Sequence, residues 1–151
     1  MAAAAGKHSC MTAPKTASSE RGTALTVFAI LFGLLAISNF LKPLRLDDQT
    51  GFVLFGIRLT GLANTIVGPL FGVFLALYAW GIWNMRRFAL PMGHFYATYV
   101  VLNLVMFSFV GPKPPDAGFG YQVFILLYAA IAIGVSAGAA IKLTGRKADL
   151  R

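Results

Sequence analysis

Charged residues are scarce in this sequence of 151 residues: they make up 12% of it, whereas hydrophobic residues make up 58%. A soluble domain carries roughly 25% charged residues, because polar side chains must cover its surface. Five acidic and thirteen basic residues are too few to cover a protein of this length. The composition therefore argues against a soluble enzyme, a secreted disulfide scaffold and a disordered chain, and it indicates a membrane protein.

Cysteine is nearly absent as well, since Cys10 is the only one in the chain. A single cysteine cannot form an intrachain disulfide or a cysteine-based zinc or iron–sulfur site. The sequence also lacks a phosphate-binding glycine loop, a nucleophile elbow, an H-E-x-x-H motif and paired catalytic carboxylates. We therefore predict that the protein is not an enzyme, and we assign it no metal.

Four apolar runs are long enough to cross a membrane as helices, at about residues 24–41, 62–83, 92–110 and 121–143. The first run is the shortest, and as an α-helix it would be about 27 Å long, close to the roughly 30 Å thickness of a bilayer core. The sequence thus predicts an all-α membrane protein, a four-transmembrane-helix bundle formed by residues 23–143. A flexible basic tail of residues 1–22 precedes the bundle, and a basic tail of residues 144–151 follows it.

Residues 44–59 connect the first two runs and are expected to form a short extracytoplasmic surface element. The segment Asp47–Gly51 is rich in turn-forming residues and separates two short extended runs. A β-hairpin with its turn at this segment fits the pattern, and so does an interfacial helix.

The distribution of lysine and arginine predicts how the bundle is oriented. If the N-terminus is inside, nine basic residues lie in inner segments and four in outer ones, and membrane proteins keep their basic loops in the cytoplasm. We therefore expect both termini in the cytoplasm and a location in a bacterial cytoplasmic (inner) membrane. The net charge of +8 does not indicate nucleic acid, because the basic residues flank apolar runs and do not alternate with aromatic ones.

Polar residues inside the apolar runs are the main candidates for function, because a polar group in a bilayer must find a partner. The third run contains His94, Tyr96, Tyr99 and Asn103. The last three are spaced i, i+3 and i+7 and share one helical face, whereas His94 lies about 160° around the helix from Tyr96. Hydrogen bonding between helices is one interpretation. The other is a pocket for a lipophilic molecule, such as a quinone or a phospholipid headgroup.

His94 also offers a ring nitrogen that can bind the iron of a haem or the magnesium of a chlorophyll. A haem held by two histidines would need a second one, and the only other histidine, His8, lies in the N-terminal tail. The alternative is a structural or interfacial role, with the side chain reaching toward the headgroups.

Small residues recur at every fourth position in two of the predicted helices. They allow close helix packing in membranes, and we predict that they form helix-contact faces. The residues are Gly68, Gly72, Ala130, Gly134 and Gly138.

These features lead to three functional interpretations in order of preference. The first is a non-enzymatic structural or accessory subunit, whose partners are membrane lipids and other integral membrane protein subunits. The second is a binder of a quinone, haem or chlorophyll through the third helix. The third is a small transporter or channel, which is disfavoured because no Asp or Glu lies inside the four apolar runs.

Overall fold

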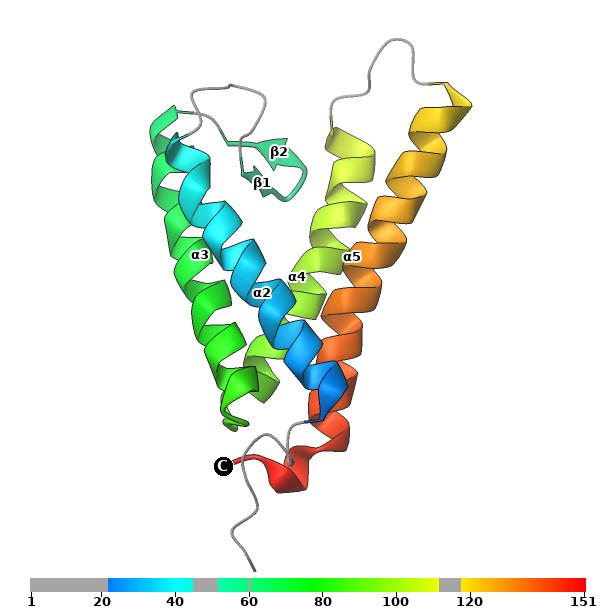
Figure 1. Cartoon of the computed structure of the whole chain (residues 1–151). Helices are drawn as coiled ribbons and strands as arrows, with labels where there is room; N and C mark the ends of the chain where they lie inside the picture. Colours follow the sequence, from blue (N-terminus) through cyan, green and yellow to red (C-terminus); the bar gives the residue numbers. More distant parts are fainter. Residues whose placement is uncertain (1–21, 45–51, 60, 112–117) are drawn as a thin grey trace, which may run out of the picture.

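The computed structural model describes residues 22–44, 52–59, 61–111 and 118–151, and four long helices dominate this part of the chain (Figure 1). The helices are α2 (Thr23–Leu41), α3 (Gly61–Trp83), α4 (Ala89–Val110) and α5 (Phe119–Gly145). All four are long and apolar enough to cross a membrane. The prediction of an all-α protein with four apolar helices of spanning length is therefore confirmed. The predicted tail of residues 1–22 lies outside the described residues apart from Gly22.

The helices extend slightly beyond the predicted limits, and α4 shows the reason most clearly. We expected this helix to start after Pro91, at about residue 92, but it begins at Ala89. Pro91 is thus the third residue of the helix, within the first turn, where backbone N–H groups have no intrahelical acceptor. A proline costs no hydrogen bond at such a position, so it does not mark the boundary.

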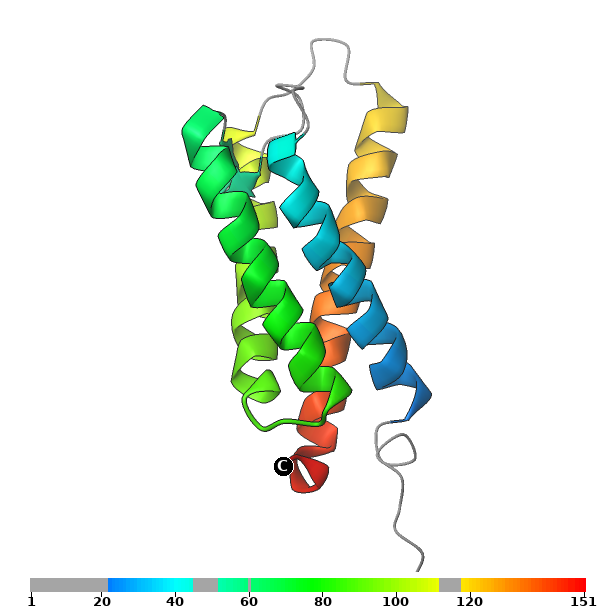
Figure 2. The same ribbon diagram turned by 60° about the vertical axis from the view of Figure 1, so that its left-hand side comes forward.

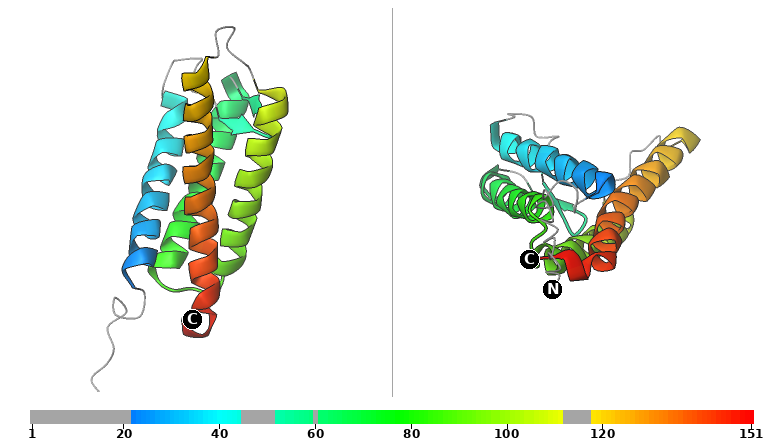
Figure 3. Two further views of the ribbon diagram at one scale, coloured as in Figure 1. Left: turned by 90° about the vertical axis from the view of Figure 1, so that its right-hand side faces the viewer. Right: turned by 60° about the horizontal axis from the view of Figure 1, so that its bottom comes forward.

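The helices form two antiparallel pairs: α2 packs along α3 (Figure 2), and α4 packs along α5 (Figure 1). The pairs lie close together at the end where α2 begins and α5 ends, and they diverge toward the opposite end (Figures 1 and 3). We call the first of these the terminal end and the second the hairpin end. At the hairpin end the helix axes of the two pairs therefore lie farther apart than at the terminal end.

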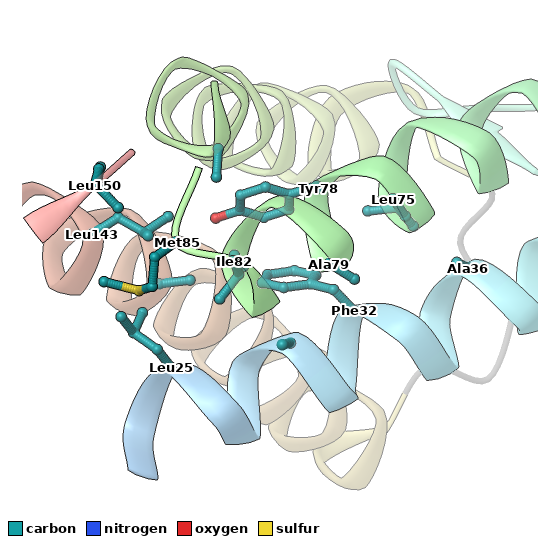
Figure 4. Close-up of a cluster of buried hydrophobic side chains, with 13 residues drawn as sticks. Leu25, Phe32, Ala36, Leu75, Tyr78, Ala79, Ile82, Met85, Leu143 and Leu150 are labelled. Atoms are coloured by element: carbon teal, nitrogen blue, oxygen red, sulfur yellow. The ribbon is translucent and has the colours of Figure 1, made fainter. Parts of the chain in front are cut away.

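The hydrophobic core lies in the half of the bundle nearest the terminal end (Figure 4). Phe32 of α2 is completely buried, and its ring centroid lies 4.7 Å from that of Tyr78 of α3. Other buried side chains of the core come from α2, α3, α5 and the segments that follow α3 and α5: Leu25, Leu75, Ile82, Met85, Leu143 and Leu150.

The chain after α5 returns to this core and does not extend into solvent. Residues Lys147–Asp149 form a short 3₁₀ helix, η3, and Leu150 is only 3% exposed. The backbone N–H of Arg151 donates to the Met85 carbonyl oxygen at 2.8 Å, and the Arg87 N–H donates to the Arg151 carbonyl oxygen at 2.8 Å. These bonds fasten the basic segment at residues 147–151 to the connection between α3 and α4.

A β-hairpin occupies the hairpin end between the two helix pairs (Figure 1). Its strands are β1 (Val53–Leu54) and β2 (Ile57–Arg58), which pair in antiparallel orientation. The described part of residues 44–59 therefore contains a hairpin, one of the two expected forms, although Lys42–Leu44 form a 3₁₀ helix, η1.

The turn of this hairpin lies at Phe55–Gly56, whereas the turn expected at residues 47–51 lies wholly outside the described residues. Phe55 and Gly56 both have positive φ angles, 50° and 82°. A two-residue turn with two positive φ angles matches the right-handed twist of the strands. Glycine adopts such a φ without strain, but phenylalanine is unusual there. The residue types common in turns therefore pointed to the polar segment at residues 47–51.

Candidate functional site

Polar side chains of α4 hold the hairpin in place. The Tyr99 hydroxyl donates to the Val53 carbonyl oxygen at 3.0 Å, and the Gly56 N–H donates to the Asn103 side-chain oxygen at 3.3 Å. The tip also packs tightly on the helix, because a Cβ added to Gly56 would lie 2.7 Å from the Met106 carbonyl group. The polar face predicted on this helix thus supplies partners to the hairpin backbone.

The start of the hairpin is anchored on α3 and η1. The Phe52 N–H donates to the side-chain oxygen of Asn64 at 2.8 Å. The Phe52 ring is buried, with its centroid 5.0 Å from that of Phe71, and the Lys42 ammonium lies 4.9 Å from the centroid of the same ring. The hairpin is therefore bound to elements of both helix pairs and spans the space between them.

A cavity of about 490 Å³ lies among the hairpin and the four helices, within the range of about 300–1,000 Å³ found for small-molecule sites. Leucine, isoleucine, alanine and phenylalanine side chains make up much of its wall. A smaller number of polar or charged side chains also line it: Asn39, Lys42, Arg58, Tyr96, Tyr99, Asn103, Ser108 and Tyr128. An apolar wall with a few polar groups is typical of a site for a lipophilic ligand.

Aromatic rings form one side of the cavity. The centroid of Phe71 lies 5.2 Å from that of Tyr99 and 6.1 Å from that of Tyr96. The Tyr96 ring also meets Phe32 edge to face at 5.3 Å. Such ring pairs add stability beyond the burial of apolar area. Through these contacts the aromatic side of the cavity packs against the core at Phe32 and extends toward the hairpin end.

Lys42 is the half-buried cation of the site. Its ammonium donates to the side-chain oxygen of Asn39 at 3.0 Å, and the amide of Asn39 donates to the Leu35 carbonyl oxygen at 2.8 Å. Burial lowers the pKa of Lys42 below its usual 10.5, because the charged form loses water. Within the described ranges the only acidic residue is Asp149, at the terminal end, so no described carboxylate compensates this charge.

The structure brings three of the four predicted site residues of α4 together and separates the fourth. Tyr96, Tyr99 and Asn103 line the same cavity. His94 is exposed, does not line this cavity, and its Nδ1 lies 2.9 Å from the Leu90 carbonyl oxygen. Among the residues that the structure describes, no group of three or more His, Cys, Asp or Glu side chains is placed to hold a metal ion.

Two of the predicted small residues lie where α3 packs on α2. A Cβ added to Gly68 would lie 3.4 Å from the Asn39 carbonyl oxygen. At Gly72 it would lie 3.2 Å from the Phe40 ring. These two glycines allow the close approach of the first helix pair.

The three small residues of α5 lie along one side of the helix, because they are spaced four residues apart. A Cβ added to Gly138 would lie 3.3 Å from the Phe28 ring of α2. Ala130 is exposed, and a Cβ added to Gly134 would meet no atom within 4 Å. Ala130 and Gly134 lie farther along α5 toward the hairpin end, where α2 and α5 diverge (Figure 1), so they form an exposed, outward face in this single chain.

Sequence reasoning did not predict that Lys42 and Arg58 line the cavity: both were counted among the four outer basic residues, and Arg58 was expected to pair with Asp47 or Asp48. Lys42 follows α2 directly and lies three residues after Asn39, a spacing that brings the two side chains together in helical backbone. Arg58 had no such local signal, since it reaches the cavity only because β2 lies between the helix pairs.

No family model matches the chain, and comparisons with curated proteins and with solved structures give no match either.

Proposed function

We propose that this membrane protein binds a lipophilic molecule with a polar headgroup in the cavity at the hairpin end, without catalysing a reaction. The observation that carries the proposal is that Tyr96, Tyr99 and Asn103, selected by their spacing, line one cavity with a largely apolar wall. Its size lies in the range of small-molecule sites. A quinone or a lipid fits these features. Haem or chlorophyll has less support, because His94 lies outside the cavity.

The test compares substitutions at two neighbouring residues of α5. Ala129 lines the cavity, whereas Ala130 is exposed on the outside of the bundle. Purified from membranes in mild detergent, the wild-type protein should carry a lipophilic molecule that mass spectrometry detects. Ala129→Phe should fill the cavity and remove that molecule, and Ala130→Phe should retain it. Equal amounts of bound molecule in both variants would contradict a ligand in this cavity.

A structural or accessory subunit is the second candidate, supported by the outward face of α5. Ala130 and Gly134 lie four residues apart on this face, and Gly134 has open space around it. Small residues at this spacing allow close contact between helices, so a second membrane protein could pack there.

The size of the complex in mild detergent tests this second candidate. Gly134→Leu should reduce the size of the complex without affecting the stability of the chain, because a Cβ at this position meets no described atom within 4 Å. Gly72→Leu, at the contact between α2 and α3, should destabilise the chain itself. An unchanged complex in Gly134→Leu would argue against docking on this face.

The proposed orientation places the terminal end in the cytoplasm of a bacterial cell and the hairpin end outside. It rests on the nine basic residues of the inner segments against four in the outer ones. Reporter fusions after residues 48, 87, 115 and 151 should read outside, inside, outside and inside. A reporter found outside after residue 87 would overturn this orientation.

A further inference from the structure

The cavity carries two cationic side chains where it meets the hairpin. Lys42 directly follows the last residue of α2, and Arg58 belongs to β2; both line the cavity. Among the described residues no carboxylate accompanies them, since Asp149 lies at the opposite end of the bundle. The described part of the cavity is therefore positively charged near the C-terminal end of α2, at the hairpin end of the bundle.

Of these two charges, that of Lys42 loses more hydration free energy, because Lys42 is half-buried and Arg58 is exposed. Among the described residues its ammonium has one hydrogen-bond acceptor, the side-chain oxygen of Asn39, and the face of the Phe52 ring as a second contact. Both contacts are to neutral groups, and a partly desolvated cation gains much more from an anion. A negatively charged group in the cavity would supply what the described residues do not.

The hydrogen-bonding groups that remain for a ligand are mostly donors. The side-chain oxygens of Asn39 and Asn103 already accept bonds from Lys42 and from the Gly56 N–H. The Tyr96 hydroxyl and the Arg58 guanidinium have no hydrogen-bond partner within the described ranges. Together with the ammonium of Lys42 they match a ligand rich in acceptor oxygens.

We infer that the ligand of this cavity is an amphiphile with an acyl tail and a carboxylate or phosphate headgroup, and that Lys42 and Arg58 bind the headgroup. The inference rests on the proposed binding function and adds to it the charge of the ligand. The headgroup lies at the hairpin end beside the two cations. The tail extends along the apolar part of the wall, where Leu35, Leu75 and Ile125 lie.

The test titrates the full chain in an uncharged maltoside detergent and counts bound molecules by native mass spectrometry. Oleate is compared with oleyl alcohol, and dioleoyl phosphatidic acid with dioleoylglycerol, so that the main difference within each pair is the charged headgroup. We expect at least one anionic member to bind about tenfold more tightly than its neutral counterpart. The pair with the larger ratio tells whether the headgroup is that of a fatty acid or of a phospholipid.

Substitutions then assign this preference to the two cations. Lys42→Gln and Arg58→Gln should each lower the ratio several-fold, and Lys42→Arg should preserve it. Arg58 is exposed, so its substitution leaves the packing intact even if the lysine variants fold poorly. Lys142→Gln is the matched control: it removes an exposed charge of α5 outside the cavity lining and should leave the ratio unchanged.

Three results would overturn the inference. Equal binding of charged and neutral amphiphiles, blocked by Ala129→Phe, would refute the anionic headgroup while leaving the proposed function in place. An equal effect of Lys142→Gln would mean that surface charge alone attracts the lipids. Binding that Ala129→Phe does not block would refute the inference together with the proposed function.

Discussion

Two tyrosines of the bundle should respond in opposite directions to the same substitution, loss of the hydroxyl group. Tyr78 is completely buried, and its hydroxyl has no hydrogen-bond partner among the described residues. It points at α4, where a Cβ added to Gly93 would lie 2.6 Å from the hydroxyl oxygen. Tyr99, in contrast, donates to the Val53 carbonyl oxygen of the hairpin at 3.0 Å.

The expected changes follow from these environments. A buried polar group without a partner costs about 1–3 kcal/mol, so Tyr78→Phe should raise the free energy of unfolding by about 1 kcal/mol or more. A side-chain hydrogen bond within a membrane contributes about 0.6 kcal/mol on average and up to about 1.7 kcal/mol. Tyr99→Phe should lower the free energy of unfolding by that amount, and its ring contact with Phe71 remains.

The assay is unfolding of the purified protein by sodium dodecyl sulfate in mixed micelles, followed by circular dichroism. Tyr96→Phe serves as a control: Tyr96 lines the cavity and its hydroxyl has no hydrogen-bond partner among the described residues, so loss of the hydroxyl should change stability little. If Tyr78→Phe destabilised the protein as much as Tyr99→Phe, the hydroxyl of Tyr78 would have a hydrogen-bond partner in the membrane. The account of the Tyr78 environment would then be wrong.

Three further predictions concern the hairpin, the terminal end and the buried lysine. Gly56→Ala should destabilise the protein by about 1–3 kcal/mol more than Gly61→Ala in the same unfolding assay: both glycines have positive φ, but only Gly56 is packed against α4. Leu150→Ala should cost about 2–5 kcal/mol, whereas Ile141→Ala, at a side chain that is 68% exposed, should cost little. Burial lowers the pKa of Lys42 from 10.5, so the unfolded chain holds its proton to higher pH than the folded one. The free energy of unfolding should then rise as pH increases toward 10.5, and Lys42→Met should remove that part of the rise.

The four helices could be predicted from the sequence because a bilayer requires long uninterrupted apolar runs. Their limits were less predictable, since the signals that end or start a helix do not act at a single residue. Pro91 shows this: it was expected before the start of α4 but lies within its first turn. The turn at Phe55–Gly56 was not predicted for a related reason. Its geometry depends on one glycine and on a phenylalanine, a residue that is unusual at positive φ.

The candidate site was predictable only where its residues share one helix. The spacing of Tyr96, Tyr99 and Asn103 was enough to place them on a common face, and that face lines the cavity. The contributions of Lys42 and Arg58 depend on how the helix pairs diverge and where the hairpin lies between them. No pattern local to either residue contains that information.

The attachment of the hairpin to two helix pairs has a consequence for biosynthesis. Asn64 follows Phe52 by 12 residues, but Tyr99 and Asn103 follow their hairpin partners by 46 and 47. While the chain is being made, α2 and α3 can associate as soon as α3 enters the membrane. The hairpin then remains held at one side until α4 has been inserted. The cavity is completed later still, when α5 supplies its remaining wall, so the proposed ligand can occupy it during assembly and need not enter the finished protein.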